Sequence, residues 1–367
     1  MSSTPFRGPV AARTHHPEET TTASLVRVHN EWDPLEEMIV GRIEGAQVPA
    51  PDRGLWAIEY PELPSIEQIP IGPFPRRVVD ETIEDLDLLA EALEKLGVRV
   101  RRPDVCDHAT PFRTPDWESS GLSNYCPRDL LLAVGETIIE APMTLRARQY
   151  ESVSYRSLLM EYFESGARWL CAPRPRLLDS VYRLPGSGAR FAIDESEPLF
   201  DAANVLRVGR NILYQVSDTG NHLGARWLQR ALGSGYRVHA LDNLYDSAHI
   251  DTTLTLVRPG LVVANAARVS RENLPPLFRS WDVVYFKDVV DTGYVGHPIS
   301  SVWLGVNFFM VNPHLAIVDR RQTALIRELA RHRVDVLPLL LRHARTLGGG
   351  FHCVTLDVRR RGELDSY

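Results

Sequence analysis

The chain has 367 residues, of which 44% are hydrophobic and 24% charged, a composition typical of a globular protein with a large core. Its 41 basic and 47 acidic residues give a net charge of −6 and are mixed along the sequence, which argues against nucleic acid or an anionic membrane as a partner. The four cysteines are widely spaced and form no CxxC pair, so neither a disulfide scaffold nor a metal site is expected.

Residues 1–24 lack the apolar stretch of a signal peptide, and no run of about 18 apolar residues occurs in the chain. We therefore expect a disordered tail over 1–24, no membrane-spanning segment, a cytoplasmic location and a single domain over 25–367. Residues 45–75 are rich in proline and lack periodicity, which predicts a long surface loop. The segment 75–97 predicts a helix. Its apolar residues at spacings of three and four form one buried face: Val79, Ile83, Leu86, Leu89 and Leu93.

A unit of two strands joined by a tight turn, a helix-like stretch and a third strand then occurs four times. The paired strands are expected at 130–142, 204–217, 253–267 and 307–319, the helix-like stretches at 146–166, 221–233, 271–281 and 321–333, and the third strands at 168–173, 236–241, 282–286 and 334–339. Glycine and proline in the turns, as at Pro259 and Gly260, supply the backbone angles that tight connections require.

A fifth unit is complete only when the two chain ends are joined. Residues 352–358 pair with strands between residues 25 and 41, and the helix at 75–97 and a strand at 98–103 follow. The alternative is an open α/β sheet of serial βαβ units. Tight hairpins inside each unit favour the ring, because parallel sheets need crossover connections instead. The fold class predicted is thus α/β, a closed ring of five ββαβ units around a central channel.

Three polar stretches lie at strand ends in different units: FDAANV (200–205), AHIDTT (248–253) and GGGFHC (348–353). A cysteine in a glycine-rich turn is, taken alone, more often a small buried hydrophobe. The glycines before Cys353 nevertheless permit a close approach to a ligand. His249 and Asp251, two apart on an expected strand, point to one face, and Asp201 adds a carboxylate. Together they indicate covalent catalysis with Cys353 as nucleophile, His249 as acid/base and Asp201 as its orienting partner.

Other residues indicate the substrate. Two acids near a thiolate, Asp129 and Asp251, suit a planar cation, and guanidinium pairs with carboxylates through two hydrogen bonds, so an arginine-like substrate fits. Arg268 and Ser301 are candidates to hold its α-carboxylate. The alternatives stay open: Asp129 as a solvated acid or turn cap, and Arg268 as an ordinary solvated residue.

Several long motifs resemble the arginine amidinotransferase family. They are FDAANVLRVGR (200–210), HIDTTLTL (249–256), SSVWLGVN (300–307) and RTLGGGFHCVTLDVRRRG (345–362), together with VHNEWDPLEEMIVGR (28–42) and CPRDLLLAVGETIIEAPMTLRARQYE (126–151). The similarity runs from about residue 25 to the C-terminus. It is closer to the inosamine-phosphate amidinotransferase of streptomycin biosynthesis than to glycine amidinotransferase.

This resemblance implies a five-bladed αβ propeller of the pentein type and ping-pong transfer of an amidino group from L-arginine, without a metal or organic cofactor. It implies Cys353 as nucleophile, His249 as acid/base and Asp201 as its partner, with Asp129 and Asp251 on the guanidinium. It also implies donor-carboxylate contacts from Arg268 and Ser301, small-molecule substrates as the only partners, and a possible homodimer.

The sequence indicates the acceptor amine less directly than it indicates the arginine donor. The glycine-using members have methionine before the catalytic histidine, whereas this chain has Ala248, which suggests room for a bulkier amine such as an aminocyclitol phosphate. A glycine amidinotransferase, a hydrolase of the same fold such as an arginine deiminase, and a non-catalytic arginine-binding protein remain alternatives. A papain-like protease fits poorly, because the histidine precedes the cysteine here.

Overall fold

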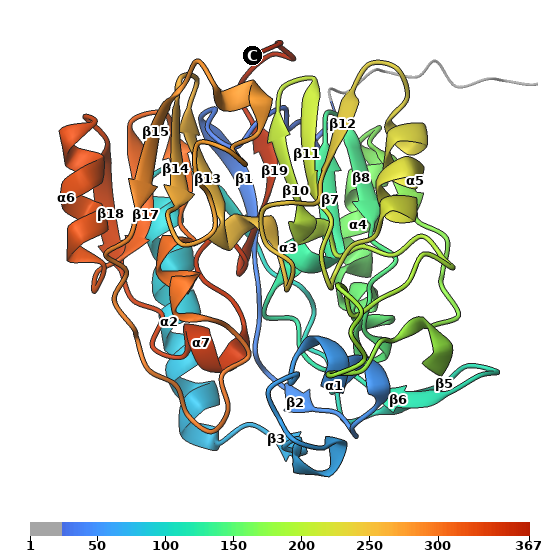
Figure 1. The fold of residues 1–367 in the computed structure, drawn as a ribbon. Coiled ribbons are helices and arrows are strands. Elements are labelled where there is room, and N and C mark those ends of the chain that lie inside the picture. The colour runs from blue at the N-terminus through green and yellow to red at the C-terminus, as the bar shows by residue number, and fades with distance from the viewer. Residues whose placement is uncertain (1–23) are drawn as a thin grey trace, which may run out of the picture.

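A computed structural model describes residues 24–367 (Figure 1). The predicted tail, residues 1–24, lies outside the described residues except for Ser24. None of the helices in the described part of the chain is both long and apolar enough to cross a membrane.

Five three-stranded sheets form the body of the molecule, and each has the same order of strands. In every sheet, which with its connecting segment we call a blade, two strands pair antiparallel and a third strand runs parallel to the second. Four blades are continuous in sequence: β7 (Leu131–Val134), β8 (Thr137–Glu140) and β9 (Arg168–Cys171); β10 (Val205–Val208), β11 (Asn211–Gln215) and β12 (Arg237–Leu241); β13 (Leu254–Arg258), β14 (Leu261–Asn265) and β15 (Asp282–Phe286); β16 (Phe309–Asn312), β17 (Leu315–Asp319) and β18 (Asp335–Leu339).

The fifth blade joins the two ends of the chain, as the sequence predicts. β19 (Thr355–Arg360) pairs antiparallel with β1 (Leu35–Val40), and β4 (Arg99–Arg101) runs parallel to β1. In Figure 1 the red β19 lies beside the blue β1 at the centre of the molecule. The mixed α/β architecture with five such blades confirms the predicted five-bladed propeller.

Local sequence explains the hairpins. Gly135, Gly209 and Gly260 occupy the tight turns of three blades with φ values of 57°, 62° and 83°, angles that favour glycine. In the fourth, the Asn312 side chain accepts a hydrogen bond from the backbone N–H of His314 (2.9 Å), which closes the turn.

An α-helix precedes the third strand in four of the five blades, and the blade of β13–β15 is the exception. Figure 1 shows α5 (His222–Leu232) and α6 (Thr323–Arg331) at opposite sides of the molecule. In the chain, α4 (Arg156–Glu164) precedes β9, and α2 (Arg76–Lys95) precedes β4. The helix predicted at 271–281 is wrong: only a 3₁₀ turn, Pro276–Phe278, forms there, because Pro275 and Pro276 lack the N–H groups of an α-helix.

The buried face of α2 is shifted from the predicted one. Leu86, Leu89 and Leu93 are buried as expected, whereas Val78 replaces Val79 in the core. Val79 and Ile83 are half-buried at the edge of the same apolar cluster. The helix therefore presents a face rotated by about one residue at its N-terminal end.

Residues 45–75 were expected to form a surface loop, and this prediction is wrong. The segment contains a short β2–β3 pair (Gln47–Val48 and Gly72–Pro73) and α1 (Arg53–Ile58), which Asp52 caps by accepting from the N–H of Leu55 (2.8 Å). Leu55, Ile58 and Tyr60 pack in an apolar cluster with residues from 145 to 199. In Figure 1 this segment lies below the blades, near the β5–β6 hairpin (Pro111–Arg113 and Glu118–Ser120).

A buried ion-pair network connects the inner strands. Arg207 on β10 donates to both carboxylate oxygens of Asp357 on β19 (2.8 and 2.9 Å) and to Glu31 (2.8 Å). Arg128 in α3 (Pro127–Leu130) and Arg360 also donate to Asp357 (2.8 and 2.6 Å). Burial by itself would raise the pKa of Asp357. The guanidinium groups outweigh it, with the largest effect from Arg207, and hold this pKa well below its usual value. The network fixes the blades that carry the polar stretches.

Candidate active site

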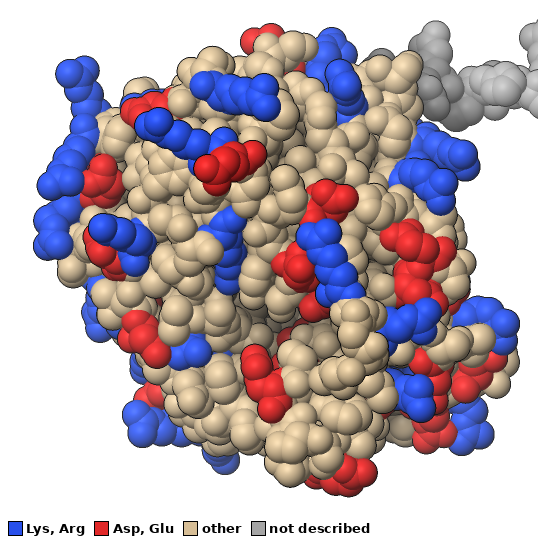
Figure 2. Space-filling view, viewed as in Figure 1, with Lys and Arg blue, Asp and Glu red and all other residues tan. Residues whose placement is uncertain are grey.

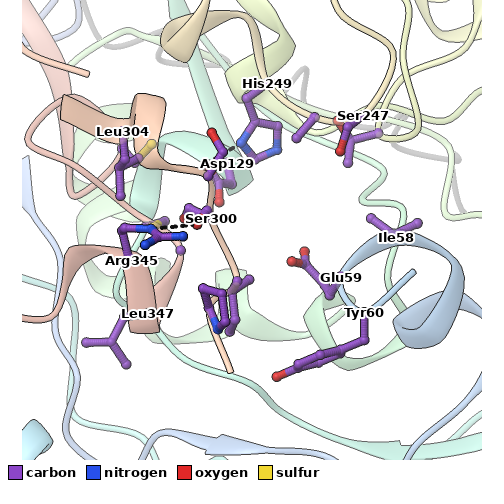
Figure 3. A pocket seen from close by; sticks show the side chains of 18 of the residues that line it. Ile58, Glu59, Tyr60, Asp129, Ser247, His249, Ser300, Leu304, Arg345 and Leu347 are labelled. Atoms are coloured by element: carbon purple, nitrogen blue, oxygen red, sulfur yellow. Dashed lines mark hydrogen bonds and ion pairs between the residues drawn. The ribbon is translucent and has the colours of Figure 1, made fainter. Parts of the chain in front are cut away.

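A cavity of about 310 Å³ lies between the blades and the segment that carries α1. Its wall is built from residues of α3, of α7 (Ala344–Leu347) and of the loops after α1, before β13 and before β16. Figure 2 shows a recess on this face with charged side chains of both signs around it, and Figure 3 shows the labelled side chains that line the cavity. The wall includes Cys353, His249, Asp129, Asp251, Ser301 and Ala248.

Cys353, just before β19, is only 2% exposed and is held on three sides. Its backbone N–H donates to Asn307 Oδ1 (3.1 Å), and Asn307 Nδ2 donates to its Sγ (3.1 Å). The thiol in turn donates to Asp251 Oδ2 (3.3 Å). The sulfur is therefore fixed in position before any substrate binds.

The three glycines before Cys353 permit this packing. Gly348 ends α7 in the left-handed conformation (φ 82°). A Cβ on Gly349 would stand 2.4 Å from Cys126 Sγ, and a Cβ on Gly350 would stand 2.7 Å from Asn307 Oδ1. Only glycine lets the backbone pass so close to the groups that hold Cys353.

His249 lies between two carboxylates. Its Nε2 is 3.2 Å from Asp201 Oδ2 and its Nδ1 is 3.6 Å from Asp129 Oδ1. Asp201 stands behind His249, outside the cavity wall, and Thr144 donates to its Oδ1 through both N–H and hydroxyl (3.0 Å each). The expected strand at His249 and Asp251 is wrong, since a 3₁₀ turn (Ile250–Thr252) begins after His249, yet both side chains reach the cavity.

Asp129 and Asp251 each keep one free carboxylate oxygen. Arg148 donates to Asp129 Oδ2 (2.7 Å), and His352 Nδ1 is 2.8 Å from Asp251 Oδ2. The other oxygens, Asp129 Oδ1 and Asp251 Oδ1, are buried and have no hydrogen-bond partner within residues 24–367. Buried polar atoms are rarely left without a partner, so these two point to a ligand with N–H donors.

The charges of the site are set by its neighbours. The neighbouring Cys126 sulfur, burial and the Asp251 carboxylate raise the pKa of Cys353 well above its usual value. Burial opposes the charged imidazole, but Asp129 and Asp201 together raise the pKa of His249 well above 6.5. The ligand-free site therefore holds a protonated thiol and a protonated histidine near neutral pH.

Arg268 and Ser301 are brought together, as a site for a carboxylate requires. Arg268 donates to Ser301 Oγ (3.1 Å) and to Thr252 Oγ1 (2.7 Å), and its guanidinium stacks on Tyr245 with 3.4 Å to the ring centroid. Ser301 and Tyr245 line the cavity, whereas Arg268 stands behind them.

Several residues at the site were missed in the sequence. Glu59, Cys126, Arg148 and Arg345 line the cavity, and Asn307 orients Cys353. Arg345 is anchored by Asp291 (2.6 Å) and by the carbonyl of Ser300 (3.1 Å). None belongs to a local sequence pattern that marks a site, since Arg345 and Asn307 contact residues more than 40 positions away. Among residues 24–367, no group of three or more His, Cys, Asp or Glu side chains is arranged to hold a metal ion.

Comparison with known proteins places this arrangement in a family. No family model matches the chain. It is 57% identical over 346 residues to inosamine-phosphate amidinotransferase 1 of Streptomyces glaucescens, an alignment that covers 94% of this chain and 99% of the relative. The chain belongs to the amidinotransferase family. A second amidinotransferase, the mitochondrial glycine amidinotransferase of Danio rerio, is 37% identical over 385 residues, covering 100% of this chain and 90% of the relative.

Solved structures agree with the amidinotransferase assignment. The inosamine-phosphate amidinotransferase of Streptomyces griseus superposes with a TM-score of 0.92 at 57% identity, over 94% of this chain and 99% of that one. DDAH of Pseudomonas aeruginosa matches with a TM-score of 0.55 at 15% identity, over 88% of this chain and 99% of that one, which shows a shared fold alone. The pentein-type propeller expected from the sequence is therefore confirmed.

Proposed function

We propose that this amidinotransferase moves the amidino group of L-arginine, through a covalent adduct on Cys353, to an aminocyclitol phosphate and releases ornithine. The observation that carries the proposal is a pair of buried oxygens that accept no hydrogen bond within residues 24–367, Asp129 Oδ1 and Asp251 Oδ1, on the wall around the thiol. A guanidinium group supplies N–H donors for both. Arg268 with Ser301 offers a site for the donor carboxylate.

Binding of the guanidinium activates the nucleophile. The free thiol is kept protonated partly by the negative charge of Asp251, which accepts a hydrogen bond from it. A guanidinium paired with Asp251 and Asp129 offsets their negative charge and places a cation beside the sulfur, which lowers the pKa of Cys353. The thiol then releases its proton to solvent, so that the thiolate forms when substrate is present and the resting enzyme is protected from side reactions.

In the first half-reaction, the Cys353 sulfur forms a bond to the guanidinium carbon of arginine. The bond between that carbon and the chain nitrogen breaks, and its electron pair leaves with the nitrogen. His249 donates the proton that makes ornithine a neutral amine as it departs, and Asp201 holds the imidazole in place. An amidino group joined to sulfur remains on the enzyme.

In the second half-reaction, an acceptor amine attacks the amidino carbon. The new carbon–nitrogen bond forms, the carbon–sulfur bond breaks, and the sulfur takes the electron pair. His249, now neutral, removes the surplus proton of the attacking nitrogen and returns it to the sulfur, and the imidazole then regains its own proton from solvent. Transfer succeeds only while water is excluded from the adduct, and the 2% exposure of Cys353 suits that need.

The choice of acceptor rests on similarity and on one residue. Inosamine-phosphate amidinotransferases are 57% identical, against 37% for the glycine enzyme, and Ala248 leaves more space at the cavity wall than a methionine. We also propose one catalytic domain over residues 25–367, because the fifth blade needs both chain ends. The cytoplasmic location and the homodimer expected from the sequence stay predictions.

Product analysis tests this function. We expect ornithine to accumulate when the protein receives arginine with a scyllo-inosamine phosphate, slower release with glycine, and only one equivalent per enzyme with arginine alone. Citrulline formed without an acceptor contradicts the proposal and indicates a hydrolase. Faster turnover with glycine overturns the choice of acceptor while leaving amidino transfer in place.

A further inference from the structure

Glu59 faces the catalytic groups from the opposite wall of the cavity. It ends α1, where its backbone N–H donates to the carbonyl of Leu55 (3.0 Å). Figure 3 shows its carboxylate directed into the cavity, with His249 and Asp129 across the open space. The Glu59 carboxylate accepts no hydrogen bond from residues 24–367. Its oxygens are therefore available to a ligand.

Its surroundings give Glu59 an unusual proton affinity. Burial raises the pKa of Glu59 to about 7, with Arg148 and His249 lowering it and Asp201 and Asp129 raising it. Tyr60 is also beside it, and burial together with Glu59 raises the pKa of that phenol. A carboxyl group that exchanges its proton near neutral pH is suited to act as an acid or base at that pH.

Glu59 is directed at the end of the cavity that His249 and Asp129 occupy (Figure 3). Arg268, at the donor-carboxylate end, stands behind the cavity wall and stacks on Tyr245. His249 marks the place where the departing nitrogen leaves and the incoming nitrogen enters. Glu59 therefore lies beside the incoming amine and away from the α-carboxylate of arginine.

The chemistry of the second half-reaction leaves one proton without a carrier. An alkyl amine arrives mainly as an ammonium ion, because its pKa is like that of lysine, about 10.4. It must lose a first proton to expose its lone pair, and a second one after it has attacked. His249 takes the second, as described above, and is then committed to returning it to the sulfur.

We infer that Glu59 is a catalytic residue of the second half-reaction, which binds the acceptor's ammonium group and takes its first proton. This inference rests on the proposed function. The N–H bond of the ammonium breaks, its electron pair stays on nitrogen as the attacking pair, and the proton joins the Glu59 carboxylate. The carboxylic acid releases this proton to solvent after the guanidino product leaves, so no oxidant, reductant or further reactant is needed.

The test separates the two half-reactions in Glu59→Gln, with Glu67→Gln as a matched control. Glu67 is an exposed acid of the same segment that does not line the cavity. Rapid mixing with arginine alone measures adduct formation, and adding a scyllo-inosamine phosphate or hydroxylamine then measures adduct decay. Hydroxylamine is largely uncharged at pH 7 and needs no removal of a first proton.

We expect Glu59→Gln to form the adduct at a rate within about twofold of wild type and to transfer it to the inosamine phosphate about 100-fold more slowly. Transfer to hydroxylamine stays close to that of wild type. In the wild type, the rate of transfer to the ammonium acceptor rises with pH through about 7, because the base must be deprotonated, and Glu59→Gln loses this limb. Glu67→Gln behaves as wild type in every assay.

Two results overturn the inference. An equal loss with hydroxylamine and with the inosamine phosphate shows that Glu59 does not handle the ammonium proton, and slower adduct formation shows that it serves the donor. A wild-type enzyme that forms no adduct defeats the proposed function itself, which distinguishes that failure from a failure confined to Glu59.

Discussion

The Cys353 thiol is kept uncharged by the residues that touch it. Cys126 lies beside Cys353 on the cavity wall, and a hydrogen bond that its sulfur accepts is the largest influence that raises the pKa of Cys353. Burial and Asp251 act in the same direction, while His249 opposes them. A second thiol at this position therefore adjusts reactivity without taking part in bond formation.

Replacing Cys126 tests this role. In Cys126→Ala the hydrogen bond is lost, so the pKa of Cys353 falls and its alkylation by iodoacetamide reaches half its maximal rate at a lower pH than in wild type. Peptide mass spectrometry follows Cys353 separately from the other cysteines, and Cys106→Ala, a half-buried cysteine elsewhere, serves as control. An unchanged midpoint in Cys126→Ala would show that the neighbouring thiol has no such effect.

Among the structural elements, the turn between α7 and β19 is tightly constrained beside Cys353. It brings the backbone of Gly350 against Asn307, whose amide holds both the N–H and the sulfur of Cys353. Space for a side chain is absent there, and the position of the nucleophile depends on it.

Gly350→Ala should therefore displace Asn307. We expect a loss of about 1–3 kcal/mol in the free energy of unfolding, measured by urea denaturation, with a larger relative loss of transferase activity. The control is Gly235→Ala, at an exposed turn where an added Cβ meets nothing within 4 Å. If Gly350→Ala loses no more stability and activity than Gly235→Ala, then Gly350 is not needed to leave space for Asn307.

The sequence predicts elements well where local chemistry decides them. The hairpins follow from turn glycines such as Gly209, and the apolar runs on either side of these turns predict the strands. It fails where long-range packing decides. Residues 45–75 lack periodicity because α1 packs on side chains from 145 to 199, and Pro276 prevents the helix that the repeat pattern suggests at 271–281.

At the scale of the whole molecule, ring closure assembles the site. β19 pairs with β1, and the buried Arg207–Asp357–Glu31 network connects the inner strands behind Cys353. His352 extends this network to the site, since its Nδ1 is 2.8 Å from Asp251 and its Nε2 is 3.4 Å from Glu31. The charged core and the catalytic groups therefore form one continuous structure.

The same closure explains which site residues the sequence revealed. Cys353, His249 and Asp201 stand in polar stretches that interrupt apolar strands, so their convergence follows from the repeat. Glu59 and Cys126 reach the cavity from a segment without periodicity and from the turn before α3. Nothing in the local sequence marks such residues, because their role comes from what they face across the cavity.

The most direct test of the account is intact-protein mass spectrometry after incubation with arginine alone. We predict a mass increase equal to one amidino group, located on Cys353 by peptide mapping, that persists until a scyllo-inosamine phosphate is added and is absent from Cys353→Ser. Ornithine production at the wild-type rate by Cys353→Ser, or a wild-type enzyme that turns over with no adduct on Cys353, would contradict covalent transfer through this thiol.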